Sequence, residues 1–514
     1  MSASISGLNA SNANLAAPGD PIIRKREIQG DVLVGLQKDE EHFLFFKIVD
    51  VARFKAALRD YIIAEITTTE EVLSREIQIK AYKASGRRSR LPFVGLNIGF
   101  SNDGLSVLLG ANGTDGMDAS FVAGAGVRAA GLLDPVDANG KPDWLAAFAS
   151  DTIHGVLLVT GPAASASAAK SPAQKKVDDI VNVLGHSIKL VYRDVGVTRP
   201  QRGHEHFGFL DGVSNPGVRG ITPRDNPADD NQGVPGQDLL WPGAFVFGYP
   251  GQDPNQPFEK PGAPPAMAHP WMADGSYMVF RRLNQFVPEF HNFLQSEGRA
   301  LGIDPQLVGA RMVGRWQSGA PIMIAPLQDD PALGADPKAN NNFEFSQDTG
   351  ERRCPFAAHI RKTYPRDDLE DPNKVGLLNP EGFVQAHRIM RAGIPFGPEV
   401  AEDEEKTKHE RGLMFVCYQT SIIEQFEFIQ ISWANATGFP INKVHPDKTP
   451  ATPGHDPIIG QAKGARAMDE ILPNYPMGDT RSTLNMPDAF VKPSAAGYFF
   501  VPSISALRNT LAHP

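Results

Sequence analysis

One pattern recurs three times along the chain: a short apolar run, which predicts a buried strand, and then apolar residues at helical spacing, which predict an amphipathic helix. In its first occurrence, residues 43–48 form the run, and Val51, Phe54, Leu58 and Tyr61 mark one face of the helix. The later occurrences are residues 277–280 with Phe286, Phe290 and Phe293, and residues 413–417 with Ile422, Phe426, Ile429 and Trp433.

Strands are also predicted at residues 155–159 and 187–192. Strands that alternate with helices in this way favour split β-α-β units in an α+β fold. Because the strand–helix pattern returns in the second half of the chain, we expect two similar domains.

The boundary between these domains is suggested by composition. Pro, Gly, Asp and Asn crowd residues 223–270, which we interpret as a linker, although residues 244–247 inside it fit a short strand. We therefore expect a polar leader over residues 1–25, a first domain over 26–235 and a second over 236–514.

Charge and hydropathy exclude some classes of protein. The 514 residues carry 50 basic and 59 acidic side chains, a net charge of −9, so the basic surplus of a nucleic-acid-binding protein is missing. No run approaches the ~18 apolar residues that a membrane helix needs. The two cysteines, Cys354 and Cys417, allow one disulfide at most, and unpaired thiols are the favoured interpretation.

Candidate chemistry begins with the run Gly208-Phe-Leu-Asp211-Gly212. Glycines on both sides let the backbone approach a flat ligand closely, and the acid between them can transfer protons. Taken alone, an Asp-Gly turn is the commoner explanation. Metal binding by His204 and His206, two residues apart, is also conceivable, but no third ligand is near and a structural role is favoured.

His359 is the second candidate, in the run Cys354-Pro-Phe-Ala-Ala-His359-Ile-Arg-Lys362. The two alanines leave space beside the imidazole, which a haem iron or another metal ion needs. An ordinary core or surface histidine stays open, as does ligation by the Cys354 thiolate. The third candidate is Arg391, whose neighbours Ala392 and Gly393 leave room around its permanent charge, with a structural ion pair as the alternative.

Together and in this order, the motifs resemble those of the dye-decolourising peroxidases, with the fungal branch closest. The resemblance rests on residues 204–216, 354–362 and 391–393, and it extends over nearly the whole chain. Further runs that carry it begin at Ile28, Gly314, Arg411 and Asp456.

The resemblance implies two ferredoxin-like domains, with one haem b bound mainly by the C-terminal domain. His359 is implied as the proximal ligand of the iron. Asp211 and Arg391 are implied on the peroxide side, where the acid moves the proton and the guanidinium stabilises the growing negative charge. A carboxylic acid in that role predicts activity that falls from about pH 4 toward neutrality.

Further positions are implied with less direct support from the residues. Leu413 and Phe415 alternate along one strand, so both would line the distal pocket with Phe209. Asp456 is implied as the acceptor of a hydrogen bond from His359.

Oxidation of bulky donors requires a route from the haem to the surface. The resemblance implies Trp433 as a surface residue for this electron transfer, while the corresponding tyrosine position is occupied by Phe396, which lacks an oxidisable phenol. Packing of Trp433 inside its helix is the alternative interpretation.

The resulting hypothesis is a haem peroxidase that reduces hydrogen peroxide and oxidises dyes, phenols and similar aromatic donors in one-electron steps. The alternatives are a haem carrier or iron-releasing protein without peroxidase turnover, a chlorite-dismutase-like enzyme, and a haem-free structural protein. The sequence does not choose among aromatic donors and Mn(II), nor does it predict an oligomeric state. The resemblance implies an extracellular protein, whereas the first 20 residues lack the features of a secretory signal, so a cytoplasmic location stays open.

Overall fold

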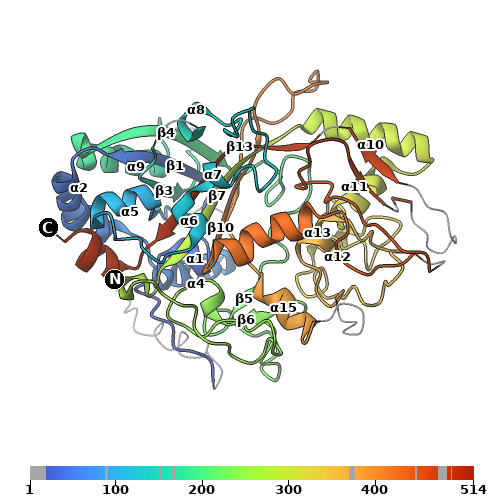
Figure 1. Cartoon of the computed structure of the whole chain (residues 1–514), viewed down its shortest axis with the longest axis horizontal. Helices are drawn as coiled ribbons and strands as arrows, with labels where there is room; N and C mark the ends of the chain where they lie inside the picture. The colour runs from blue at the N-terminus through green and yellow to red at the C-terminus, as the bar shows by residue number, and fades with distance from the viewer. Residues whose placement is uncertain are drawn as a thin grey trace.

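A barrel of eight antiparallel strands lies at the centre of the molecule (Figure 1). The computed structural model describes residues 19–86, 91–149, 152–164, 169–369, 377–445, 448–469, 471–472, 483–487 and 489–513. The strand order β7-β13-β2-β3-β1-β4-β9-β10 closes on itself through the β10–β7 pairing. The barrel strands are β1 (Glu40–Ile48), β2 (Gly95–Phe100), β3 (Gly155–Gly161), β4 (Ile188–Val197), β7 (Ser276–Gln285), β9 (Ile394–Phe396), β10 (Gly412–Gln419) and β13 (Val491–Val501).

The barrel consists of two four-stranded halves, one from each half of the chain. β2, β3, β1 and β4 form the first, and β9, β10, β7 and β13 form the second. The register pairs Gly196–Phe396 and Phe100–Phe500 join them, and we call these two places the seam. A Cβ on Gly196 would lie 2.3 Å from Cγ2 of Ile394, so the close approach needs glycine there. The α+β fold with two ferredoxin-like units is confirmed, while the domain boundaries stay a prediction.

Aromatic side chains fill the barrel interior. Phe45 on β1 lies with its ring centroid 4.9 Å from that of Phe280 and 6.1 Å from that of Phe499, although neither β7 nor β13 neighbours β1 in the sheet. The alternate residues Leu44 and Phe46 belong instead to the core between barrel and helices. Both faces of the strands are therefore buried, which explains why the strands appear in the sequence as continuous apolar runs.

Helices follow the strands as the periodicity predicted. The first apolar run leads into α2 (Val51–Ala57), η3 (Leu58–Ile62) and α3 (Ile63–Glu65), and the second into α10 (Val287–Leu301). The third leads into two π-helical segments, η7 (Ile422–Glu427) and η8 (Ile429–Ala434).

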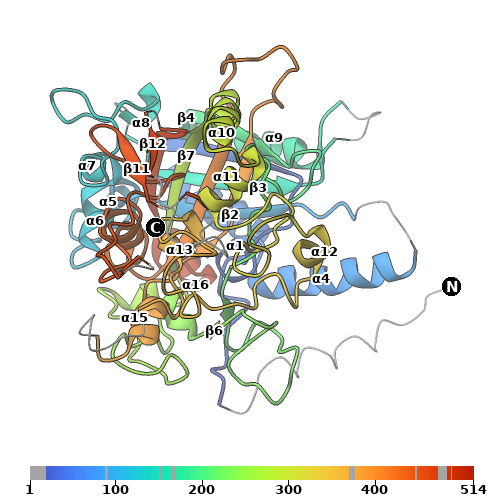
Figure 2. The same cartoon turned by 90° about the vertical axis from the view of Figure 1, so that its right-hand side faces the viewer.

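Other helices pack around the barrel or project from it. Figure 2 shows α4 (Thr69–Ala84) extending away from the body; Thr68 and Glu71 cap its first turn. The remaining helices are α1 (Gly30–Leu33), α5 (Asn102–Leu109), α6 (Ala119–Ala123), α7 (Ala125–Arg128), α8 (Ala146–Ala149), α9 (Pro172–Leu184), η4 (Gly185–Ser187), η5 (Pro242–Ala244), η6 (Pro270–Met272), α11 (Pro305–Val313), α12 (Pro331–Ala335), α13 (His359–Thr363), α15 (Pro380–Ala386), α16 (Ile504–Ala506) and η9 (Leu507–Leu511). Within the described residues, no helix is both long and apolar enough to cross a bilayer.

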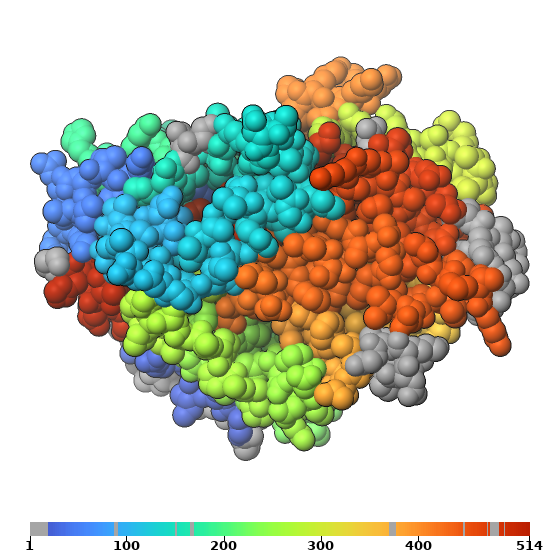
Figure 3. All heavy atoms as spheres, viewed as in Figure 1, coloured from blue at the N-terminus to red at the C-terminus, as the bar shows by residue number. Residues whose placement is uncertain are grey.

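The interpretation of residues 223–270 as a linker was wrong. This segment packs against both halves of the molecule (Figure 3) and includes Phe245 and Val246, both 0% exposed. Residues 244–247 do not form a strand, because the chain turns there through η5 and the following turns. Short strands lie outside the barrel or at its end: β5 (Gly217–Val218), β6 (Leu239–Leu240), β8 (Met390–Arg391), β11 (Arg466–Met468) and β12 (Leu484–Met486).

The predicted polar leader lies partly outside the described residues, because the description begins at residue 19. Its described end is bound to the body of the protein. Asp20 accepts two hydrogen bonds of 2.9 Å from the guanidinium of Arg224, and Ile23 is buried in the barrel core.

Candidate active site

His359 opens the short helix α13 and lines a cavity beside the barrel. Its Nδ1 donates a 2.8 Å hydrogen bond to Oδ2 of Asp456, which is fully buried. The other carboxylate oxygen, Oδ1, accepts from the backbone amides of Ile458 and Ile459 at 2.8 and 2.9 Å. Because these amides fix the carboxylate and the carboxylate accepts from Nδ1, the neutral imidazole carries its proton on Nδ1, and Nε2 is the nitrogen that can bind a metal ion.

The electrostatics of this pair favour a strong ligand. Burial acts against both charged forms, but the attraction between the two groups outweighs it, so the pKa of His359 is raised and the pKa of Asp456 is lowered. The buried carboxylate thus stays ionised and increases the electron donation of the imidazole. The predicted contact between Asp456 and His359 exists in the structure.

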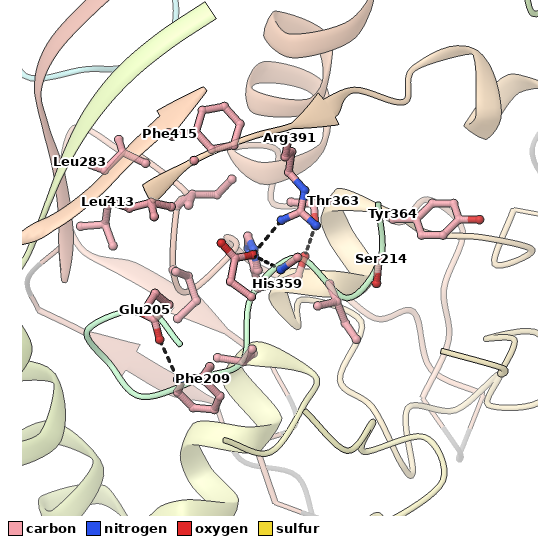
Figure 4. A pocket seen from close by; sticks show the side chains of 18 of the residues that line it. Glu205, Phe209, Ser214, Leu283, His359, Thr363, Tyr364, Arg391, Leu413 and Phe415 are labelled. Atoms are coloured by element: carbon pink, nitrogen blue, oxygen red, sulfur yellow. Dashed lines mark hydrogen bonds and ion pairs between the residues drawn. The ribbon is translucent and has the colours of Figure 1, made fainter. Parts of the chain in front are cut away.

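Asp211 and Arg391 line the same cavity as His359. One guanidinium nitrogen of Arg391, which Figure 4 shows above His359, donates to Oδ1 of Asp211 at 3.0 Å, and both side chains of this pair are partly exposed. The amide of Gly212 donates to the same carboxylate oxygen at 2.6 Å. The sequence brings these three side chains from positions 211, 359 and 391 to one place, as the hypothesis required.

The loop before Asp211 is held by a residue that the sequence interpretation missed. Glu205 lines the cavity and accepts hydrogen bonds of 2.8 Å from the amides of Phe207 and Phe209. Burial raises the pKa of Glu205. Gly208, with φ +97°, allows the tight turn between those amides.

The two histidines around Glu205 are structural. His204 Nδ1 contacts the carbonyl oxygen of Arg202 at 2.9 Å, and His206 Nε2 contacts that of Phe396 at 2.8 Å. Within the part of the chain that is described, no group of three His, Cys, Asp or Glu side chains is placed to hold a metal ion. Both cysteines are free and buried.

The remaining walls of the cavity are largely apolar. Leu413 and Phe415, on alternate positions of β10, both face it, and so does Phe209. Their predicted position is therefore found, while their part in peroxide access stays a prediction. The apolar lining consists of Phe207, Phe209, Leu210, Val213, Leu283, Val313, Phe343, Ile360, Ile389, Leu413, Phe415, Phe426, Ile429, Ile458, Ile459, Val491 and Pro493.

Three further arginines, Arg315, Arg366 and Arg388, give the cavity an excess of positive charge. Arg315 is 3% exposed and donates to backbone carbonyls, Ser214 and Asn341. Burial, with the charges of Arg366 and Arg391, lowers its pKa to about 9. In the described ranges, no carboxylate lies within 4.0 Å of Arg315 or Arg366. Arg388 lies 4.0 Å from Asp238, but the three buried guanidinium groups outnumber the acids beside them, and such an excess of buried positive charge suits an anionic ligand.

This chemistry fits an iron porphyrin. A flat ring system needs apolar walls, the iron needs the free Nε2 of His359, and the carboxylate side chains of a porphyrin suit Arg315, Arg366 and Arg388. The three arginines were missed in the sequence, where Arg315 appeared only within a family motif.

Trp433 does not lie on the surface, contrary to the expected surface role. Its side chain is 1% exposed and packs face to face with Phe439, at 5.2 Å between ring centroids, with His387 and Phe428 at its edges. A bulky donor therefore cannot contact the indole in this conformation, because neighbouring rings cover it. Phe396 is also buried, beneath the guanidinium of Arg282 at 4.0 Å.

Comparison with known proteins agrees with this chemistry. Residues 27–200 match the family model of the DyP dimeric alpha+beta barrel domain. The chain is 39% identical to the dye-decolorizing peroxidase msp1 of Mycetinis scorodonius over 95% of this chain and 87% of the relative. A solved variant of the dye-decolorizing peroxidase of Pleurotus ostreatus has a TM-score of 0.82 at 39% identity, covering 96% of this chain and all of that one (100%). A solved dye-decolorizing peroxidase in complex with 2,6-dimethoxyphenol has a TM-score of 0.77, with the same identity (39%) and the same coverage (96% and 100%). The chain therefore belongs to the dye-decolourising peroxidases.

Proposed function

We propose that this protein reduces hydrogen peroxide at haem b and takes the electrons, one at a time, from dyes, phenols and similar aromatic donors. The observation that carries the proposal is the convergence of a buried His–carboxylate pair and an Asp–Arg pair on one cavity. Family membership supports the same reaction, and a solved relative holds a phenol, 2,6-dimethoxyphenol.

Haem, when bound, supplies the iron at which peroxide is reduced. His359 would hold the iron through Nε2, and Asp456, which accepts from Nδ1, makes the imidazole a stronger electron donor. Arg315, Arg366 and Arg388 would offer their positive charges to the two carboxylates that distinguish haem b from an apolar ring.

Asp211 is the group that moves the proton. Its carboxylate takes the proton from one peroxide oxygen and returns it to the other, which then leaves as water. Arg391 stabilises the negative charge on the departing oxygen and, through its 3.0 Å hydrogen bond, holds Asp211 in position. Leu413, Phe415 and Phe209 leave room for a small molecule and exclude bulk water.

The test compares the parent chain with Asp211→Asn, both loaded with hemin. Addition of peroxide should shift the Soret band of the parent at once, and the variant should react roughly 10²–10⁴-fold more slowly. Equal rates would contradict the role of Asp211. A parent band that never shifts would instead favour a haem carrier or iron-releasing protein, which needs neither Asp211 nor Arg391.

An extracellular location is proposed on family membership alone. Comparing peroxidase activity in culture medium and in washed cells of the source organism tests it, and activity confined to the cells would contradict it.

A further inference from the structure

Tyr364 is a cavity-lining residue for which the reaction above has no use. It follows α13, five positions after His359, and its ring is 8% exposed at the cavity wall. Figure 4 shows the ring extending away from His359 and Arg391, with the hydroxyl at its far end. Tyrosine and tryptophan are the readily oxidised side chains, and the described lining of the cavity holds this tyrosine and no tryptophan.

The hydroxyl of Tyr364 has a dedicated proton acceptor. It donates a short hydrogen bond to Oδ2 of Asp238, and Gln385 Nε2 donates to the same oxygen at 2.8 Å. The same Gln385 nitrogen lies 3.2 Å from the tyrosine hydroxyl, so the three groups form one fixed network. The Asp238 side chain is 13% exposed, which gives a transferred proton access to solvent.

The charges around the ring decide how it can lose an electron. The guanidinium carbon of Arg388 lies 3.6 Å from the ring centroid and that of Arg366 lies 4.9 Å away. Two cations at this distance disfavour a positively charged ring. Burial raises the pKa of Tyr364, so the phenol is protonated before oxidation. Electron loss therefore requires that the proton leave at the same time, and Asp238 is in place to accept it.

We propose that Tyr364 is a redox-active residue that supplies one of the two electrons consumed by each peroxide. The electron passes from the phenol to the haem site, the O–H bond breaks, and its proton goes to Asp238, leaving a neutral phenoxyl radical. A phenolic donor then returns one electron to Tyr364, Asp238 returns the proton, and the donor releases its own proton to water. This inference rests on the proposed peroxidase function.

Electron paramagnetic resonance of samples frozen milliseconds after peroxide addition, without any donor, tests the proposal. The hemin-loaded parent should give a tyrosyl signal, and Tyr364→Phe should lose it. Tyr192→Phe is the matched control, because the Tyr192 hydroxyl also donates to a carboxylate, Asp194, at 3.1 Å but lies outside the cavity lining. That control should keep the full signal.

Asp238→Asn provides a second variant that leaves every ring in place. Without the proton acceptor, the radical yield should fall by roughly tenfold or more. A tyrosyl signal that survives in Tyr364→Phe, an unchanged yield in Asp238→Asn, or a parent signal from tryptophan alone would each overturn the proposal. The Soret band distinguishes failure of the Tyr364 proposal from failure of the proposed peroxidase function. A Soret shift with no tyrosyl signal refutes the role of Tyr364 and leaves the peroxidase function standing. The absence of any Soret shift refutes both.

Discussion

Replacing Asp456 by asparagine should damage haem binding while preserving the shape of the side chain. The amide oxygen can still accept from the amides of Ile458 and Ile459, so the NH₂ group is directed at Nδ1 of His359. Two donors then face each other in a fully buried place. His359 can relieve this only by moving its proton to Nε2, which is the nitrogen that the iron needs.

The size of the effect follows from the contacts that are lost. The bond between Asp456 and His359 is 2.8 Å long, buried and charge-assisted, a class that contributes about 1.5–3 kcal/mol. Since ~1.4 kcal/mol corresponds to a factor of ten, hemin affinity should fall by roughly 10–100-fold, the range found for partners of metal-ligating histidines. The reduction potential should rise, because a less anionic imidazole stabilises ferric iron less.

Titration of the apoprotein with hemin at the Soret band measures the affinity, and spectroelectrochemistry measures the potential. Glu427→Gln is a suitable control, because Glu427 is also a buried carboxylate but pairs with Arg128, away from the cavity lining. It should lower stability and leave the potential unchanged. If folded Asp456→Asn bound hemin as tightly as the parent and at the same potential, the role assigned to the His359–Asp456 pair would be refuted.

Three other outcomes are expected. Dye and phenol turnover should fall steadily from about pH 4 to neutrality, because reduction of each peroxide to water consumes two protons, and a flat pH profile would show that proton supply does not limit turnover. Trp433→Phe should affect bulky dyes and small donors equally, or neither, in steady-state assays, because the indole is buried and bulky donors cannot contact it; a loss confined to bulky dyes would show that electrons do pass through it. Phe280→Ala should reduce the free energy of unfolding in urea by about 3–5 kcal/mol, since it removes a ring that packs against Phe43 and Phe45; a loss below about 1 kcal/mol would mean that the interior repacks.

Hydrophobic periodicity was sufficient to locate the three strand–helix pairs, because both faces of their strands are buried. It could not predict closure of the barrel. The seam depends on single register pairs such as Gly196–Phe396, and a lone glycine among β-branched residues carries no periodic signal. Composition misled at residues 223–270, where frequent Pro and Gly indicated a linker but Phe245 and Val246 anchor the segment.

The candidate site likewise contains residues that the sequence predicted and residues that it did not. Asp211, His359 and Arg391 stand in distinctive short motifs, so the sequence identified them and the fold brings them together. Arg315 and Glu205 were missed, because their importance depends on what surrounds them in space. Arg315 is a buried cation that donates to the side-chain oxygen of Asn341, and Glu205 accepts from two amides of the loop before Asp211.

The seam between the barrel halves also lies beside the candidate site, because β9 carries the seam residue Phe396 and Arg391 lies just before it in the chain, on β8. Asp211 follows the strands of the first half, whereas Arg391 lies on β8, just before β9, the strand that meets Gly196. His359 and Asp456 both come from the second half of the chain. The loop of Asp211 is nevertheless tied to the second half, because Asn215 donates to the carbonyl of Arg391 at 2.9 Å and Gln317 donates to that of Phe207 at 3.0 Å, so the acid and the guanidinium stay together when the seam loosens. Gentle heating that opens the seam should then leave the 3.0 Å pair of Asp211 and Arg391 intact, so that peroxide turnover and bound haem colour are lost together.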